Sequence, residues 1–234
     1  MKVFQKGFNF SQDGPGNRLV YHVAGCNMHC RWCSNPEGMQ IRGTETEYTP
    51  EDIVKEAISC KMMFFDGGGV TFTGGEATLD AKELIATLKG LKDAGINTAL
   101  ETNGTSPHLL EIALHLDHLM MDFKHHDDEK LLTYTGMSGE TIRANYEALC
   151  KGGFPCHIRI PLIYEFNGDA AKGIANYLSQ HDTRNITFEL LRYHEYGREK
   201  WQDAYGITDG FITDEVFDQF IREMERCGLH CINT

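Results

Sequence analysis

The sequence lacks the long apolar, low-complexity and repetitive segments that distinguish membrane, disordered and repeat proteins from ordinary globular ones. No run approaches the roughly 18 consecutive apolar residues of a membrane helix, and the first six residues include no apolar signal segment. The chain also lacks low-complexity tracts, Pro-rich linkers and internal repeats, and its 6 prolines are scattered singly. We therefore expect a single domain over residues 1–234, located in the cytoplasm and without membrane contact.

Positive charge is scarce in this chain. Lys and Arg number 22 against 34 Asp and Glu, so the formal net charge is −12, and the sequence has no long basic block. Nonspecific binding to the phosphate backbone depends on clustered Lys and Arg, so this balance disfavours nucleic acid as a partner. We expect a monomer that does not bind DNA or RNA.

The 8 cysteines point to metal chemistry, because a chain expected in the cytoplasm keeps its thiols reduced. Cys26, Cys30 and Cys33 form a C-x3-C-x2-C run. Iron–sulfur clusters are usually held by cysteine thiolates. Three closely spaced cysteines can bind three irons of one [4Fe–4S] cube, which leaves the fourth iron without a protein ligand. A structural zinc site is the alternative from the residues alone, and it needs a fourth ligand such as His29.

Strand-like and helix-like patterns alternate along the chain, which is typical of parallel β/α architecture. The expected fold is α/β, an incomplete (β/α)6 barrel. The predicted strands are Arg18–Ala24, Gly69–Thr73, Asn97–Thr102, His118–Phe123, Cys156–Ile160 and Ile186–Leu191. The predicted helices are Pro50–Lys61, Asp80–Ala94, Asp127–Thr135, Gly139–Gly152, Gly168–His181 and Asp214–Cys227.

Polar groups recur where the predicted strands end. In β/α barrels the working residues lie at these carboxyl ends and in the loops that follow them. The cysteine run follows the first strand, and glycines with a carboxylate follow the second. The later strands end at or near further polar residues, namely Glu101, Thr102, Asp122, Lys124, Arg159 and His194. The recurrence predicts a site built around a bound cofactor.

The cysteine run, with Trp32 before its last cysteine, resembles the signature of the radical S-adenosylmethionine (SAM) enzymes. The resemblance implies a TIM-like partial barrel of the radical SAM type and a [4Fe–4S] cluster on Cys26, Cys30 and Cys33. It also implies SAM bound to the open iron and cleaved, after a one-electron reduction, to a 5′-deoxyadenosyl radical. Gly74, Gly75 and Glu76 resemble the motif that holds the SAM amino group, and glycines permit a close backbone approach.

The segment Asp13, Gly14, Pro15, Gly16, Asn17, Arg18 narrows the resemblance to the activating enzymes of glycyl radical enzymes. It is similar to the D-G-P-G-x-R segment with which that family meets the partner's glycine loop. On its residues alone the segment is a turn. The resemblance implies that Asp13, Gly14, Pro15, Gly16 and Arg18 bind the partner.

The same family supplies further expectations for SAM binding. Asp122 and Lys124 resemble its D-x-K motif, and Arg159 its R-x-P arginine, whose guanidinium suits a carboxylate. His194 resembles a histidine placed near the adenosyl group, and Asn35 an asparagine near SAM; Trp32 offers an aromatic face to adenine. The resemblance also implies a monovalent-cation site, at Glu101, Thr102, Met120 and Asp122.

The remaining cysteines predict no second cluster. Many activators with Ser-Asn-Pro-Glu after the triad carry an insertion with further cysteine sets, but here only 40 residues separate Cys33 from Gly74, and they include one cysteine. The sequence assigns no role to Cys60, Cys150, Cys156, Cys227 or Cys231.

The resemblance implies an oxidoreductase of anaerobic metabolism. The enzyme abstracts a hydrogen atom from a backbone glycine of a separate glycyl radical enzyme, with reduced flavodoxin or ferredoxin as electron donor. Two alternatives remain open. One is a radical SAM enzyme acting on a small molecule, like the 7-carboxy-7-deazaguanine synthases, and the other is a non-catalytic metal-binding module. The sequence does not identify the glycyl radical partner.

Overall fold

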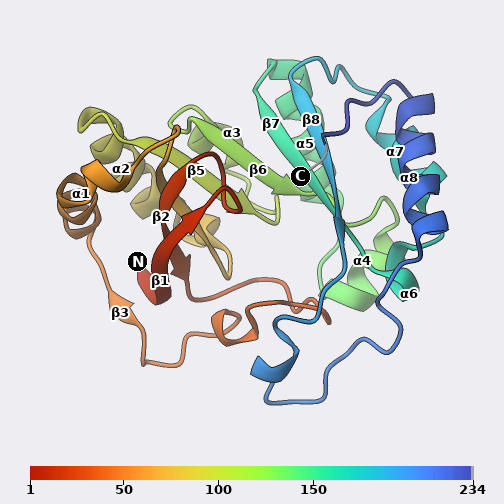
Figure 1. Ribbon diagram of the computed structural model, residues 1–234, viewed down its shortest axis with the longest axis horizontal. Helices are drawn as coiled ribbons and strands as arrows, with labels where there is room; N and C mark the ends of the chain where they lie inside the picture. The colour runs from red at the N-terminus through yellow and green to blue at the C-terminus, as the bar shows by residue number, and fades with distance from the viewer. Residues whose placement is uncertain (233–234) are drawn as a thin grey trace. The chain divides into compact units, whose positions relative to one another are not determined.

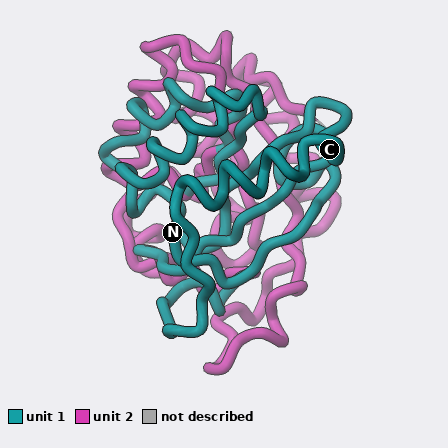
Figure 2. Tube along the Cα trace, turned by 90° about the vertical axis from the view of Figure 1, so that its left-hand side faces the viewer, with its two compact units in different colours: residues 1–27, 35–102, 106–120 teal, residues 28–34, 103–105, 121–234 magenta. Residues whose placement is uncertain are grey.

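The computed structural model describes residues 1–232, which form two compact units. Unit 1 comprises residues 1–27, 35–102 and 106–120, and unit 2 comprises residues 28–34, 103–105 and those from 121 onward (Figure 2). The chain therefore passes between the units inside the cysteine run, with Cys26 in unit 1 and Cys30 and Cys33 in unit 2. A single domain over residues 1–234 stays a prediction.

Parallel pairing dominates the sheet, whose strand order is β3-β1-β2-β4-β5-β6-β7-β8. The pairs β2–β4, β4–β5 and β7–β8 are parallel, while β1 is antiparallel to β2 and β3. This arrangement confirms the expected α/β class. The strands are β1 (Lys2–Phe10), β2 (Asn17–Val23), β3 (Thr46–Glu47), β4 (Gly69–Gly74), β5 (Asn97–Thr102), β6 (His118–Asp122), β7 (Cys156–Leu162) and β8 (Ile186–Arg192).

Several of the α-helices begin at a side chain that caps a free N–H group. Thr49 and Asp52 form a capping box at the start of the first helix, and Asp127 accepts from two amides at the start of the fourth. In the described part of the chain, no helix is both long and apolar enough to cross a membrane. The α-helices are α1 (Pro50–Ser59), α2 (Ala81–Asp93), α3 (Leu109–Ala113), α4 (Asp128–Thr135), α5 (Glu140–Gly152), α6 (Tyr164–Asn167), α7 (Ala171–Leu178) and α8 (Asp214–Arg226).

Unit 1 is organised by β2, β4 and β5, which start together. Arg18, Gly69 and Asn97 are paired across the amino ends of these strands, and Val23 is paired with Gly74 at the carboxyl ends of β2 and β4. Helices α1 and α2 lie side by side in this unit (Figure 1). Because parallel strands share one direction, the loops after β2, β4 and β5 leave from the same edge.

Unit 2 contains the parallel pair β7–β8, with α7 and α8 side by side (Figure 1). A cluster of apolar side chains in this unit includes Phe166, which is fully buried. Trp32 packs on Phe166 with ring centroids 4.6 Å apart, and Tyr134 does so at 5.1 Å. Full burial of a side chain such as that of Phe166 stabilises the fold by about 1.5–3 kcal/mol. The cluster thereby fastens the second half of the cysteine run.

The six predicted strands are present, and β5 has the predicted bounds. Strand β7 continues beyond the predicted Ile160 to Leu162, with Pro161 inside the ladder opposite Leu191. Arg159 therefore lies within the strand and not at its end. Strands β1 and β3 and helices α3 and α6 were not predicted. Most of β1 is exposed, so it has no clear apolar alternation, and the other three elements span only 2 to 5 residues.

Candidate active site

The first part of the cysteine run lies at the carboxyl edge of unit 1. The Gly25 amide donates to the Gly38 carbonyl at 2.8 Å, and the Cys26 amide donates to the Met39 carbonyl at 3.0 Å. The residues after the run, up to Met39, thus fold back on its beginning. Cys26 is partly exposed and its thiol is free of any disulfide. Cys26 is therefore partly accessible to solvent.

The second part of the run is tied to unit 2 through its backbone. The His29 amide donates to the Thr135 carbonyl at 2.8 Å, and the Arg31 amide to the Tyr134 carbonyl at 3.1 Å. The indole nitrogen of Trp201 donates to the Cys33 carbonyl at 3.0 Å. A Cβ at Gly197 would stand 2.4 Å from the Ser34 Cα, so the chain before Trp201 passes directly against the run.

The three cysteines of the run supply a donor set that fits an iron–sulfur cluster. None of the three forms a disulfide, and Cys30 is buried while Cys26 and Cys33 are partly exposed. Each cysteine of a cube binds its own iron, so the sulfurs stand farther apart than the ligands of one ion. Among residues 1–232, no three His, Cys, Asp or Glu side chains are grouped as ligands of a single metal ion. The soft thiolates suit iron, and three of them leave one corner of a cube without a protein ligand.

Glu76 stands next to the start of the run with a fixed carboxylate. The Gly75 amide donates to the Val23 carbonyl at 2.7 Å and the Glu76 amide to the Gly25 carbonyl at 2.8 Å. A Cβ at Gly75 would be 2.2 Å from the Gly25 carbonyl oxygen, so only glycine permits this approach. Glu76 is 2% exposed, and its Oε1 accepts from the hydroxyls of Thr78 at 2.5 Å and Thr102 at 2.8 Å.

The residues of the predicted cation site divide between the two units. Glu101, Thr102 and Met120 belong to unit 1, and Asp122 belongs to unit 2. The Thr73 hydroxyl donates to Glu101 Oε2 at 2.7 Å. Since the Thr102 hydroxyl donates its hydrogen to Glu76, it can offer a cation only its oxygen lone pairs. Cation binding at these residues stays a prediction.

Unit 2 carries the other charged residues predicted to bind SAM. Lys124 forms an ion pair with Asp122, and 7% of the Lys124 side chain is exposed. The Arg159 Nε donates to Glu189 Oε2 at 3.0 Å, and 16% of the Arg159 side chain is exposed. These two ion pairs hold the cationic groups of Lys124 and Arg159 in defined positions within this unit. Their roles in SAM binding stay predictions.

The aromatic and polar residues predicted near the adenosyl group are spread over three segments. His194 follows β8, its ring stacks on Tyr196 with centroids 4.3 Å apart, and desolvation lowers its pKa, which favours the neutral imidazole. Trp32 lies against Phe166. Asn35 precedes the short helix at Pro36–Gly38, and its carbonyl accepts from the Gly38 amide at 2.9 Å. Their contacts with SAM also stay predictions.

Part of the predicted partner-binding segment, residues 13–18, is buried and stabilises the fold. Arg18 is fully buried, and its guanidinium donates to the carbonyls of Pro15, Gly67 and Val70 and to Asn97 Oδ1. This arginine therefore fastens the amino ends of the strands, although sequence reasoning grouped it with the partner contacts. Gly16 is buried as well, whereas Pro15 is exposed and Asp13 and Gly14 are half-buried. Partner binding by the segment stays a prediction.

Several side chains at these positions were not singled out by sequence reasoning. Glu189 and His157 form one polar chain with Arg159, Thr78 fixes Glu76, and Trp201 holds Cys33. Glu189 lay on a predicted strand beside that of Arg159, so a parallel register would have paired the two residues. No local pattern indicated Trp201, because its partner is 168 residues away in sequence.

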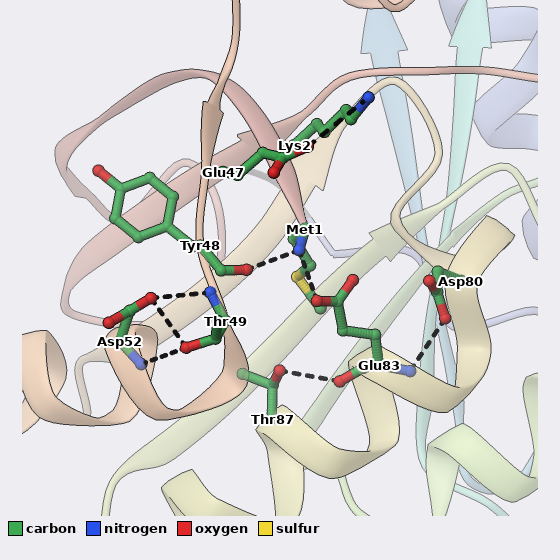
Figure 3. Close-up of polar contacts among 9 residues, drawn as sticks. All are labelled: Met1, Lys2, Glu47, Tyr48, Thr49, Asp52, Asp80, Glu83 and Thr87. Atoms are coloured by element: carbon green, nitrogen blue, oxygen red, sulfur yellow. Dashed lines mark hydrogen bonds and ion pairs between the residues drawn. The ribbon is translucent and has the colours of Figure 1, made fainter.

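A cavity of about 480 Å³ in unit 1 borders both Gly25 and Glu76. Its wall includes the apolar side chains of Ile41 and Leu79. Figure 3 shows its polar end, where the Met1 nitrogen donates to the Tyr48 carbonyl at 2.6 Å and to Glu83 Oε1 at 2.7 Å. These bonds tie the residue before β1 to α2 and to the segment before α1.

The fold and the cysteine site define a radical SAM protein. The family model of the Radical SAM superfamily matches residues 20–178. The chain is 34% identical over 206 residues to the pyruvate formate-lyase-activating enzyme of Streptococcus mutans, covering 82% of this chain and 77% of the relative. It is also 34% identical over 197 residues to the enzyme of that name from Clostridium pasteurianum, with 81% of each chain covered. The chain belongs to the radical SAM superfamily, and within it to the activating enzymes of the pyruvate formate-lyase type.

Solved structures agree with this assignment. A domain of the pyruvate-formate lyase-activating enzyme from Bacteroides vulgatus superposes with a TM-score of 0.60 at 28% identity, covering 70% of this chain and 98% of that domain. Streptococcus suis SuiB bound to S-adenosylmethionine reaches a TM-score of 0.68 over 92% of this chain and 49% of its own, at 14% identity, which supports the fold alone. The expected partial barrel of the radical SAM type is confirmed.

Proposed function

We propose that this enzyme activates a glycyl radical enzyme by removing a hydrogen atom from one of its backbone glycines. The observation that carries the proposal is the contact of the Glu76 loop with Gly25. That contact joins the backbone of Glu76, whose buried carboxylate suits an ammonium group, to the residue before the first cysteine of a three-thiol run. An amino acid that binds at an open iron needs a cysteine run that holds the cluster. It also needs a fixed acceptor nearby for its ammonium group.

In this proposal Cys26, Cys30 and Cys33 hold one [4Fe–4S] cluster. When bound, the cluster and SAM supply a one-electron cleavage of the sulfonium to methionine and a 5′-deoxyadenosyl radical, which takes the glycine hydrogen. The chain's own residues bind and orient the reactants. Glu76 accepts from the SAM ammonium group, and its bonds from Thr78 and Thr102 keep the carboxylate in place.

The other predicted residues complete the binding of SAM. Arg159 donates to the carboxylate of SAM, Asp122 and Lys124 contribute one charge of each sign, and Asn35 lies near SAM. Trp32 offers its ring to adenine and His194, kept neutral, lies near the adenosyl group. A monovalent cation binds at Glu101, Thr102, Met120 and Asp122, where two carboxylates supply the negative charge.

The partners follow from the same proposal. Asp13, Gly14 and the exposed Pro15 contact the glycine loop of the glycyl radical enzyme, while Arg18 and Gly16 hold the turn that presents them. Reduced flavodoxin or ferredoxin supplies the electron. The enzyme works as a monomer in the cytoplasm, under anaerobic conditions.

The test is an anaerobic assay of SAM cleavage and radical transfer. The protein is reconstituted with iron and sulfide, reduced and given SAM, and 5′-deoxyadenosine is quantified. Candidate glycyl radical enzymes are then added and screened by electron paramagnetic resonance. We expect product from the wild type and from Cys60→Ser, a matched change outside the run, but none from Cys30→Ser.

Each other outcome has a defined meaning. If SAM is cleaved, no candidate gives a glycyl signal and a small molecule is turned over, the result would support a radical SAM enzyme that acts on a small molecule. A fully loaded cluster that never cleaves SAM would leave only a metal-binding module.

A further inference from the structure

A buried carboxylate links the two strands of the β7–β8 pair. Glu189 on β8 is paired in register with Arg159 on β7, and only 5% of its side chain is exposed. Residues two apart on a strand share a face, so His157 lies on the same face as Arg159, and Thr187 on the same face as Glu189. Four polar side chains thus form one row on a single face of this pair.

The row is continuous in its hydrogen bonds. Arg159 Nε donates to Glu189 Oε2 at 3.0 Å, and His157 Nε2 lies 2.8 Å from the same oxygen. An ionised carboxylate only accepts, so His157 carries its hydrogen on Nε2. His157 Nδ1 lies 2.9 Å from the Thr187 hydroxyl, which donates to it when the imidazole is neutral. Thr187 thereby fixes the ring, the ring fixes Glu189, and Glu189 fixes Arg159.

The bond to Nε decides how the guanidinium is oriented. A guanidinium is planar, and holding Nε sets both the plane and the directions in which Nη1 and Nη2 donate. A free arginine side chain samples many rotamers, and ordering it at the moment of binding weakens the affinity for a ligand. An arginine held beforehand binds a carboxylate without that loss.

The composition of the row argues against a purely structural role. Removing two charges from water is costly, and apolar pairs of similar size stabilise a fold equally well or better. Glu189 Oε2 has two donors, His157 and the proposed SAM arginine itself, so this oxygen is satisfied within unit 2. Such an arrangement serves orientation better than stability.

We propose that Glu189 is a positioning residue for SAM: together with His157 and Thr187 it holds Arg159 ready for the SAM carboxylate. The inference rests on the proposed role of Arg159. It predicts that loss of Glu189 weakens recognition of the carboxylate specifically and leaves the rest of SAM recognised as before.

The test compares two ligands that differ only in the carboxylate. Binding of SAM and of decarboxylated SAM to the cluster-loaded protein is measured by equilibrium dialysis, for wild type, Glu189→Gln, His157→Phe and Arg159→Lys. We expect Glu189→Gln to weaken SAM binding about tenfold, because it removes a charged hydrogen-bond acceptor, and to leave decarboxylated SAM unchanged. His157→Phe should act in the same direction by about threefold, and it serves as the second variant should Glu189→Gln fail to fold.

The ratio of the two affinities separates the outcomes. If Glu189→Gln or His157→Phe weakens the binding of both ligands equally, the positioning role is overturned, since a structural defect would not discriminate between the two ligands. Unchanged binding of both ligands overturns it as well. If Arg159→Lys keeps the full preference for SAM over decarboxylated SAM, the proposed role of Arg159 itself fails. Loss of preference in Arg159→Lys but not in Glu189→Gln would reject the positioning role alone.

Discussion

The buried guanidinium of Arg18 orders the backbone of unit 1. Its donors satisfy carbonyls from the turn before β2 and from the starts of β4 and β5. Burial lowers its pKa to about 10, so it remains charged at neutral pH. The composition of the segment predicted a turn, and the D-G-P-G-x-R resemblance predicted partner contacts, but neither could separate the exposed Pro15 from the enclosed Arg18.

Replacing Arg18 should strongly destabilise the fold. We expect Arg18→Ala to lower the free energy of unfolding by about 3–5 kcal/mol, because several buried carbonyls lose their donor at once. Arg184→Ala is the matched control, since 87% of that side chain is exposed, and it should change stability by less than about 0.5 kcal/mol. Urea unfolding followed by circular dichroism measures both. Equal midpoints for the two variants would contradict the structural role.

Among the elements, the loops after β2 and β4 depend on each other. Gly75 approaches the carbonyl oxygens of Gly25 and Gly38, at 2.2 Å and 2.6 Å from the position a Cβ would take. The sequence marked the Gly-Gly-Glu loop by its composition. The reason that glycine is required there became visible only with the return of the chain at Gly38, which no local pattern encodes.

Gly75→Ala should therefore disturb the cysteine run without touching a thiol. The added methyl group must displace the backbone at Gly25, so we expect the iron content after anaerobic reconstitution to fall by more than about half. Gly7→Ala is the control, because a Cβ at that position meets no atom within 4 Å. The measurement is iron and sulfide per protein. Full iron loading of Gly75→Ala would show that the close approach is dispensable.

For the whole molecule, acid stability should depend on His125. This buried histidine accepts at Nδ1 from the Asp127 amide at 2.8 Å, and within the described residues its Nε2 has no hydrogen-bond partner. Burial, followed by the neighbouring His126, lowers its pKa from 6.5 to about 4. Between these two values the unfolded chain binds a proton that the folded chain refuses, so the free energy of unfolding falls as the pH is lowered from 6.5 towards 4.

The variant His125→Asn keeps an acceptor for the Asp127 amide and does not titrate. Over that pH range it should lose roughly 2 kcal/mol less stability than the wild type does. Unfolding free energies measured at several pH values between 4 and 7.5 provide the comparison. Parallel curves for the two proteins would rule out His125 as the source.

The sequence predicted the parallel core of the molecule better than its margins. Asn97–Thr102 and Ile186–Leu191 are buried runs bounded by turn residues, and both are strands. The exposed β1 was not predicted because it has no clear apolar alternation, and its strand structure depends on antiparallel pairing with β2. In the same way the cysteines and Glu76 were found from short motifs, whereas Glu189 and Trp201 depend on pairings between distant segments.

The hydrogen bond from Trp201 to Cys33 has an optical consequence. The chain has 2 tryptophans, and both lie at the cysteine run: Trp32 is part of the run, and the indole of Trp201 donates to the carbonyl of Cys33. Iron–sulfur clusters absorb light at the wavelengths where indole emits, so a cluster on this run would quench both emitters by energy transfer. The intrinsic fluorescence of the unlabelled protein would then rise and fall with cluster loss and assembly, and could be followed in real time without any added probe.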